Sequence, residues 1–102
     1  MSDVIVTNDA MGGRLVVRTD DDEAELVYDR DATHLYLLHT EVPDAFRGQG
    51  TGARLVTAAL DLARQNGLVV VPWCPFARGW LREHPAATEG VSIDWKTPPS
   101  TE

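Results

Sequence analysis

Three glycines within five residues are the part of this chain best suited to chemistry. Residues 46–52 read Phe-Arg-Gly-Gln-Gly-Thr-Gly, and an apolar pattern typical of a helix follows over residues 53–66. Glycine accepts positive φ and lets a ligand approach the backbone closely. A helix N-terminus presents unpaired N–H groups and a partial positive charge. The loop is therefore suited to a phosphate or pyrophosphate, with Arg47 as a fixed cation at its rim.

Two common phosphate-binding motifs do not fit this loop. A nucleoside-triphosphate P-loop ends in Gly-Lys-Ser or Gly-Lys-Thr, and this ending is missing. A dinucleotide fingerprint spaces its third glycine differently and has an acidic residue further along a βαβ unit. What remains is Arg-x-x-Gly-x-Gly between a strand with a polar end and an amphipathic helix.

Cys74 is the single cysteine, so an internal disulfide and a cysteine-rich metal site are both excluded. Pro75 suits the first position of a helix. A helix N-terminus favours the thiolate of a cysteine before it, and Arg78 one turn on would add to this effect. Two interpretations stay open: a nucleophile or lining residue at a reacting group, or a small buried apolar residue at a strand end.

His39 and Glu41 stand two residues apart on one predicted strand, so they share a face unless the strand bulges between them. Either side chain can take a proton from an ammonium group, directly or through water. His34 at a strand start and His84 before a proline are expected at the surface or as caps. Three scattered histidines do not form a zinc site, and no metal site is predicted.

Four segments before the loop are rich in strand-forming residues. They are residues 4–6, 14–19, 24–28 and 34–42, with turn-forming residues between them. The fourth is the longest and alternates poorly, which predicts a central strand covered on both faces. Pro43 cannot donate to a ladder, so this strand ends before the loop.

Two helices and a buried strand are predicted after the loop. Residues 53–66 carry one apolar stripe, and Gly67 suits the C-terminal cap. Residues 68–71 are wholly apolar, as in a parallel strand. A shorter helix from Pro75 ends before Pro85. Phe76 in this helix is expected in the core. Trp73 before the helix and Trp80 within it suit either the core or the wall of a site. Residues 91–95 are a possible last strand.

Length and charge narrow the classes of protein. The 102 residues suit one domain, and no apolar run is long enough to span a membrane. The net charge of −7 argues against nucleic-acid binding. Residues 45–85 nevertheless hold five basic and two acidic side chains, which predicts positive charge around the loop. The rest of the chain is acidic, which favours a cationic second substrate, such as an amine, beside the anionic ligand of the loop. The N-terminus lacks the pattern of a signal peptide, so a cytoplasmic location is expected.

The glycine loop resembles the pyrophosphate loop of the GNAT superfamily of N-acetyltransferases. In that pattern Arg or Gln, two residues, Gly, one residue, and Gly or Ala stand after the fourth strand and before a long helix. Residues 39–43, 67–72, 74–76 and 84–85 are similar, in the same order, to the small YjdJ-type branch. The resemblance is dense over residues 38–85 and loose before them.

The resemblance implies that acetyl-CoA is bound. Its diphosphate would lie on the amides of residues 47–52, and its pantetheine would pair with residues 40–42 like an added strand. The implied cofactor-binding residues are Thr40, Glu41, Val42, Arg47, Gly48, Gln49, Gly50, Thr51, Gly52, Cys74 and Pro75. The catalytic candidates are Cys74, Glu41 and His39.

Two departures from larger relatives bear on the catalytic groups. Many of them use a tyrosine acid on the helix after the fifth strand, but no tyrosine follows Cys74 and Trp80 occupies that helix. The branch also lacks two helices between its first strands, so the acceptor site is expected to be open.

The sequence therefore predicts one α/β (α+β) domain over residues 1–95 and a disordered tail over residues 96–102. Its sheet is mixed, mainly antiparallel and splayed between the fourth and fifth strands, with one long helix after the loop and a shorter one after Cys74. The predicted function is acetyl transfer from acetyl-CoA to an amine on a small molecule or protein. The alternative is a CoA- or acyl-CoA-binding or sensing module with little or no turnover.

Overall fold

A five-stranded sheet with the order β1-β2-β3-β4-β5 carries the fold. The computed structural model describes residues 5–8, 12–19, 21–46 and 48–96. The strands are β1 (Ile5–Asn8), β2 (Gly12–Arg18), β3 (Glu23–Arg30), β4 (His34–Glu41) and β5 (Val69–Pro72). The first four are antiparallel to their neighbours, and β5 joins β4 in parallel. The predicted mixed, mainly antiparallel sheet is confirmed.

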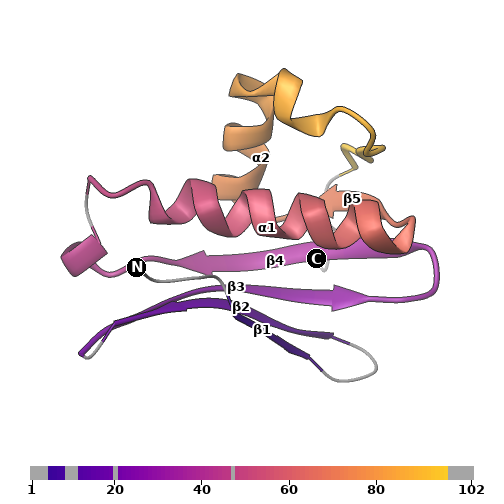
Figure 1. Ribbon diagram of the computed structural model, residues 1–102. Helices are drawn as coiled ribbons and strands as arrows, with labels where there is room; N and C mark the ends of the chain where they lie inside the picture. The colour runs from indigo at the N-terminus through magenta and orange to yellow at the C-terminus, as the bar shows by residue number, and fades with distance from the viewer. Residues whose placement is uncertain (1–4, 9–11, 20, 47, 97–102) are drawn as a thin grey trace, which may run out of the picture.

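Both helices cover the same face of this sheet (Figure 1). They are α1 (Thr51–Asn66) and α2 (Pro75–Glu83), and short 3₁₀ turns η1 (Asp44–Phe46) and η2 (Pro85–Thr88) precede α1 and follow α2. α1 begins two residues earlier than predicted. It ends at Gly67, whose φ of 66° is left-handed, as predicted for the cap. α2 ends before Pro85, also as predicted.

The core lies between the helices and one face of the sheet, as the alternation of buried and more exposed residues along β3 and β4 shows. Ala24, Leu26 and Tyr28 on β3 are buried while their neighbours are half-exposed, and Leu35 and Leu37 repeat the pattern on β4. The prediction that the fourth strand is covered on both faces is therefore wrong. Both helices pack on the side where those residues lie, so the other face of β4 keeps its polar side chains toward solvent.

β4 and β5 separate part-way along their length. Their pairing ends at Leu37 and Pro72, whereas β4 continues to Glu41. Pro72 has no N–H to continue the ladder, and the chain turns there with a hydrogen bond of 3.1 Å from the Trp73 N–H to the Val71 carbonyl. The predicted splay between the fourth and fifth strands is confirmed.

The segment after η2 returns to the free edge of β5. Val70 forms an isolated parallel bridge with Ile93, so the possible last strand is a single bridge. Position 4 of the first predicted strand, positions 9–11 of the turn after it and positions 97–102 of the predicted tail lie outside the described residues, as do positions 1–3. Within the part described, neither helix is long and apolar enough to cross a membrane.

Candidate functional site

A bulge in β4 changes which side chains face the helices. Val27 and Tyr28 are neighbours on β3, yet they pair with His39 and Leu37. Leu38 is therefore an extra residue without a partner on β3. Because side chains alternate strictly along a strand, one extra residue reverses the faces of everything after it.

The reversal separates the predicted site residues into two groups. Thr40 pairs with core residue Leu26 and points to the side covered by the helices. His39 and Glu41 point to the uncovered face, where their side chains are 61% and 69% exposed. The His39 Nε2 and Glu41 Oε1 atoms lie 3.7 Å apart, so the predicted shared face is confirmed. The bulge precedes both residues and does not separate them.

Cys74 lies on the helix-covered side, at the point where β4 and β5 separate. Its backbone N–H donates to the Leu37 carbonyl at 2.8 Å, and its Sγ lies 3.1 Å from Thr40 Oγ1. The residue is only 2% exposed and belongs to the core cluster. Cys74 is the N-cap of α2, with Pro75 at N1 as predicted. The Arg78 guanidinium donates to the carbonyls of Pro72 and Trp95, and neither of these bonds involves the thiol.

The glycine loop forms a left-handed entry into α1. Gly48 and Gly50 have φ of 78° and 69°, and a Cβ at either position would meet nothing within 4 Å. Gly50 is the N-cap of α1, and a glycine has no side chain to cap the helix, so its own side chain leaves the first amides of α1 available to a ligand. Gln49 turns its amide to the Ala45 carbonyl at 3.1 Å. Arg47 lies outside the described residues.

Gly52 is a glycine for a different reason. It stands inside α1 and does not have positive φ. A Cβ there would lie 2.5 Å from Cζ of Phe76, so the aromatic ring of α2 occupies the place of a side chain. This contact between α1 and α2 had no signal in the local sequence.

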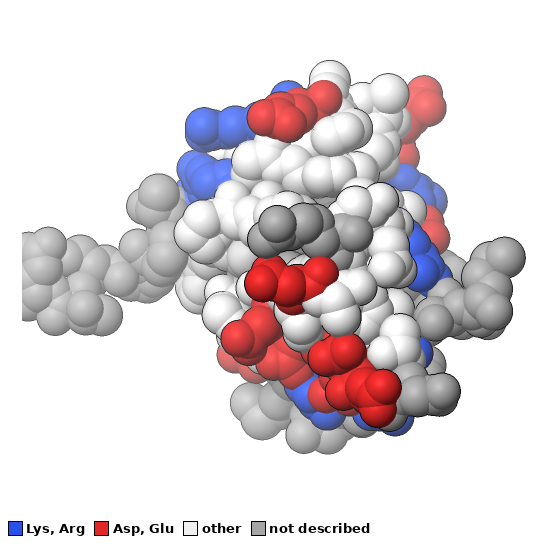
Figure 2. Space-filling model, turned by 90° about the vertical axis from the view of Figure 1, so that its left-hand side faces the viewer, with Lys and Arg blue, Asp and Glu red and all other residues white. Residues whose placement is uncertain are grey.

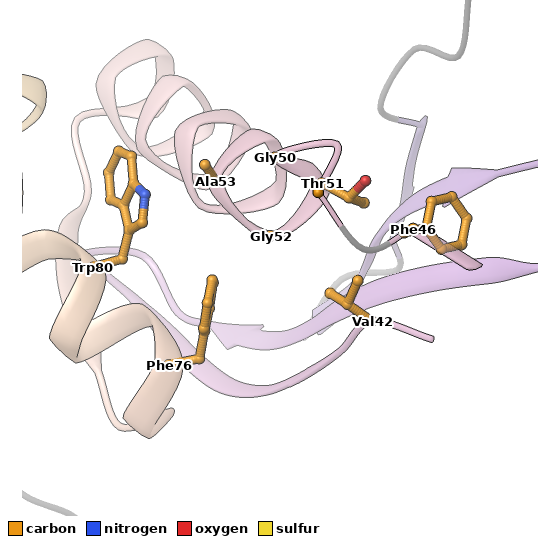
Figure 3. Close-up of a pocket in the computed structure, with 9 residues that line it drawn as sticks. Val42, Phe46, Gly50, Thr51, Gly52, Ala53, Phe76 and Trp80 are labelled. Carbon is orange, nitrogen blue, oxygen red and sulfur yellow. The ribbon is translucent and has the colours of Figure 1, made fainter. Parts of the chain in front are cut away.

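A groove of about 320 Å³ runs from this loop along α2. In Figure 3, Phe76 and Trp80 rise from α2 toward the start of α1, and Val42 and Phe46 stand on the side of β4. The full lining is Val42, Phe46, Gly48, Gly50, Thr51, Gly52, Ala53, Phe76 and Trp80.

The prediction that Phe76 lies in the core is wrong, since it is 45% exposed. Ala77 and Leu81 form the buried stripe of α2, which turns Phe76 and Trp80 toward the groove. Trp73 lies beside Tyr36, with ring centroids 5.0 Å apart.

A second, acidic hollow of about 650 Å³ lies at the end of β4. It is lined by Arg14, Glu23, Glu25, Glu41, Val42, Pro43 and Asp44, so Val42 borders both the groove and the hollow. Figure 2 views this end of the molecule, and acidic side chains gather on its lower part. In the part of the chain that the structure describes, no three His, Cys, Asp or Glu side chains form a group able to hold a metal ion.

One arginine organises the wall of this hollow. Arg14 Nη1 lies 2.5 Å from Glu25 Oε1 and 3.3 Å from Glu23 Oε1. These bonds raise the pKa of Arg14. The pKa of Glu23 is lowered, and the largest cause is its hydrogen bond from Arg18. Sequence reasoning missed Arg14 and Glu25, because only the pairing of β2 with β3 brings them together.

The expected positive charge around the loop is only partly present. Arg64 bonds to Asp61 and to two backbone carbonyls at the far end of α1. Arg78 and Arg82 both lie over the Trp95 ring, at 5.7 and 5.4 Å from its centroid. Figure 2 accordingly shows basic side chains at the margins of the loop end. Spacing along the chain did not reveal these tertiary partners.

The comparison with protein families decides the class of this chain. Residues 14–90 match the family model of the GCN5-related N-acetyl-transferases. The chain belongs to this family. The match includes the splayed strands β4 and β5, and also the glycine loop and both helices, whose residues line the groove.

Curated relatives share the same region. Protein NATD1 of Homo sapiens and of Gallus gallus are each 37% identical over 65 residues, which is 63% of this chain and 58% and 59% of theirs. Protein NATD1 of Xenopus tropicalis is 41% identical over 49 residues, or 48% of this chain and 45% of the relative. The matched part is thus less than two thirds of the length of these relatives.

Proposed function

We propose that this acetyltransferase-family protein binds acetyl-CoA in the groove and transfers the acetyl group to an amine. The single observation that carries the proposal is the position of the groove. It begins at the glycine loop and reaches Val42, at the end of β4, where the described part of the chain pairs no strand with the edge that faced β5. The cytoplasmic location expected from the sequence is part of the same proposal.

The glycine loop fits the diphosphate of this cofactor. Gly48 and Gly50 leave open space where other residues would carry a Cβ, so a phosphate can approach the backbone. The first amides of α1 point out of the helix end, where the helix dipole favours negative charge. Arg47 is kept as a proposed cation at this position.

The free edge of β4 fits the pantetheine arm. Pairing with β5 stops at Leu37, which leaves residues 38–41 without a strand on that side in the described chain. An arm that carries amides can pair with this edge as an added strand. Val42, Phe76 and Trp80 supply apolar contacts beside it.

The proposed chemistry is direct transfer. A neutral amine nitrogen attacks the thioester carbonyl carbon, the new C–N bond forms, and the C–S bond breaks. The proton that the nitrogen loses ends on the sulfur, so that CoA leaves as the thiol. A backbone N–H near Val42 polarises the carbonyl oxygen, and one such donor contributes roughly 3–4 kcal/mol in other enzymes. A cationic amine would approach from the acidic hollow, which shares Val42 with the groove.

Glu41 is the proposed base that accepts the proton of the ammonium group. It lines the hollow beside Val42, and His39 stands next to it as the second candidate. Cys74 lies on the other side of β4, is buried and contacts Thr40, so direct transfer needs no acetyl-Cys74.

Release of free CoA tests this proposal. Acetyl-CoA is incubated with the protein and a panel of amines, and we expect release that depends on both. Glu41→Gln should lower kcat/KM by about 10²–10⁴-fold, the usual contribution of a general base. Glu83→Gln, at an exposed carboxylate outside both surfaces, is the matched control. No release with any amine would refute enzyme activity.

Intact mass spectrometry separates direct from covalent transfer. Wild type and Cys74→Ala are mixed with acetyl-CoA alone. Direct transfer predicts no stable adduct on either protein, whereas an acetyl adduct that is lost in Cys74→Ala would support a covalent role for the thiol.

A binding or sensing module is the competing function. One observation favours it: no titratable side chain lines the groove itself among the described residues. It predicts that acetyl-CoA raises the melting temperature, as any ligand of the folded state must, while no amine releases CoA.

A further inference from the structure

The apex of the fork between β4 and β5 is closed by two side chains. In the part of the chain that the structure describes, the last backbone hydrogen bond across it runs from the Cys74 N–H to the Leu37 carbonyl, at 2.8 Å. Directly beyond this bond, Thr40 Oγ1 and Cys74 Sγ lie 3.1 Å apart. The pairing of β4 with β5 stops at Leu37 and Pro72, so Thr40 and Cys74 lie where the two strands separate and form the floor of the fork.

The floor is held in place by the core. Cys74 is 2% exposed and belongs to the same cluster as Leu37 and Ala77, both of which are fully buried. Close-packed interiors yield little to added volume. The groove is lined by Val42 and Phe76 but by neither member of the pair, so the open space ends before the apex.

We propose that Thr40 and Cys74 together set the length of the acyl group that the protein accepts. The inference rests on the proposed function, since the thioester of an acyl-CoA must point along β4 toward the apex. An acetyl group ends at the floor, whereas each added methylene pushes against the thiol and the hydroxyl. The role of Cys74 is then a matter of shape and does not require a bond to the acyl group.

The fork offers matched variants for this idea. Thr40→Ala and Cys74→Ala each remove volume from the floor. Thr40→Val keeps the size of the side chain but loses the hydroxyl, and Cys74→Ser keeps a hydrogen-bonding group of similar shape. Only the two alanine variants should open space for a longer chain.

The experiment measures dissociation constants of CoA, acetyl-CoA, propionyl-CoA and butyryl-CoA for each protein by calorimetric titration. Wild type should bind propionyl-CoA at least about 10-fold more weakly than acetyl-CoA, in line with the 10–200-fold discrimination of one methylene in other enzymes. The alanine variants should reduce this ratio about 10-fold, and Thr40→Val and Cys74→Ser should keep it within about twofold of wild type. A general loss of stability weakens the binding of all four compounds alike, including free CoA, so it does not change the ratio of propionyl-CoA to acetyl-CoA.

Equal binding of acetyl-CoA and propionyl-CoA by wild type would overturn the inference and leave the proposed function standing. An unchanged ratio in both alanine variants would do the same. If wild type binds none of the four compounds, the proposed function itself fails and the inference falls with it. Should Cys74→Ala fail to fold, Thr40→Ala with Thr40→Val still decides the matter.

Discussion

The contact between Gly52 and Phe76 leads to a quantitative prediction about the groove. Gly52→Ala places a Cβ 2.5 Å from Cζ and 2.8 Å from Cε2 of the Phe76 ring. Both distances are far below van der Waals contact, so the ring must move. Phe76 is 45% exposed, and its ring can move without opening the core.

Two opposing effects set the stability of this variant. Replacing glycine by alanine in a helix favours the folded state by about 0.5–1 kcal/mol. Full burial of a phenylalanine contributes roughly 1.5–3 kcal/mol, so displacing a half-exposed ring costs about 1 kcal/mol. Gly52→Ala should therefore be near neutral in wild type and stabilising in the Phe76→Ala background. The coupling free energy between the two positions is about 1 kcal/mol.

Urea denaturation of the two single variants and the double variant measures this coupling. Gly79→Ala is the control, since Gly79 lies in α2 with nothing within 4 Å of an added methyl group, and it should stabilise by about 0.5–1 kcal/mol in either background. Gly52→Ala should also weaken CoA binding about fivefold, since the displaced ring enters the groove, whereas Gly79→Ala should not. Coupling below about 0.3 kcal/mol, the level of independent sites, would refute the contact.

Three further predictions concern the loop, the β3–β4 turn and the tether of the C-terminal segment. Gly50→Ala and Gly67→Ala each force a left-handed alanine and should each cost about 1 kcal/mol in urea denaturation. Only Gly50→Ala should weaken CoA binding in calorimetry, and equal effects of the two variants on binding would contradict the proposed binding of the diphosphate at the glycine loop. Asp31 accepts bonds from two backbone amides, which lower its pKa, so its contribution to stability is present at neutral pH and is lost as the pH falls below about 4. Asp31→Asn should flatten that pH dependence of stability, and an unchanged curve would count against it. Arg78→Ala removes the bonds to the Pro72 and Trp95 carbonyls and should speed amide hydrogen exchange over residues 92–94, whereas equal exchange would show that the tether is unimportant.

Local signals in the sequence predicted most of the elements. Gly67 and Pro75 marked a helix end and a helix start, because their backbone preferences act within a turn. The polar end of β4, Pro43 and the glycine loop indicated where a strand gives way to a helix. The order of these motifs was enough to indicate the family that the comparison with residues 14–90 shows.

Faces and partners were decided by the tertiary structure. Leu38 becomes a bulge only when β4 pairs with β3, and this one residue places Thr40 beside Cys74 and turns Glu41 to the other face. Period two alone would have placed Glu41 on the side of Leu37. A strand does not carry its own register, since the partner strand sets it.

The sequence by itself determined the glycine loop, the helix caps and the order of elements, because these depend on backbone preferences of neighbouring residues. Only the tertiary structure decided that the Phe76 ring fills the space that a side chain at Gly52 would need, and that Arg14 forms an ion pair with Glu25 at the hollow. It also decided that Cys74 closes a fork inside the core. Each of these contacts joins residues far apart in the chain, and such contacts follow from packing and strand pairing rather than from local spacing.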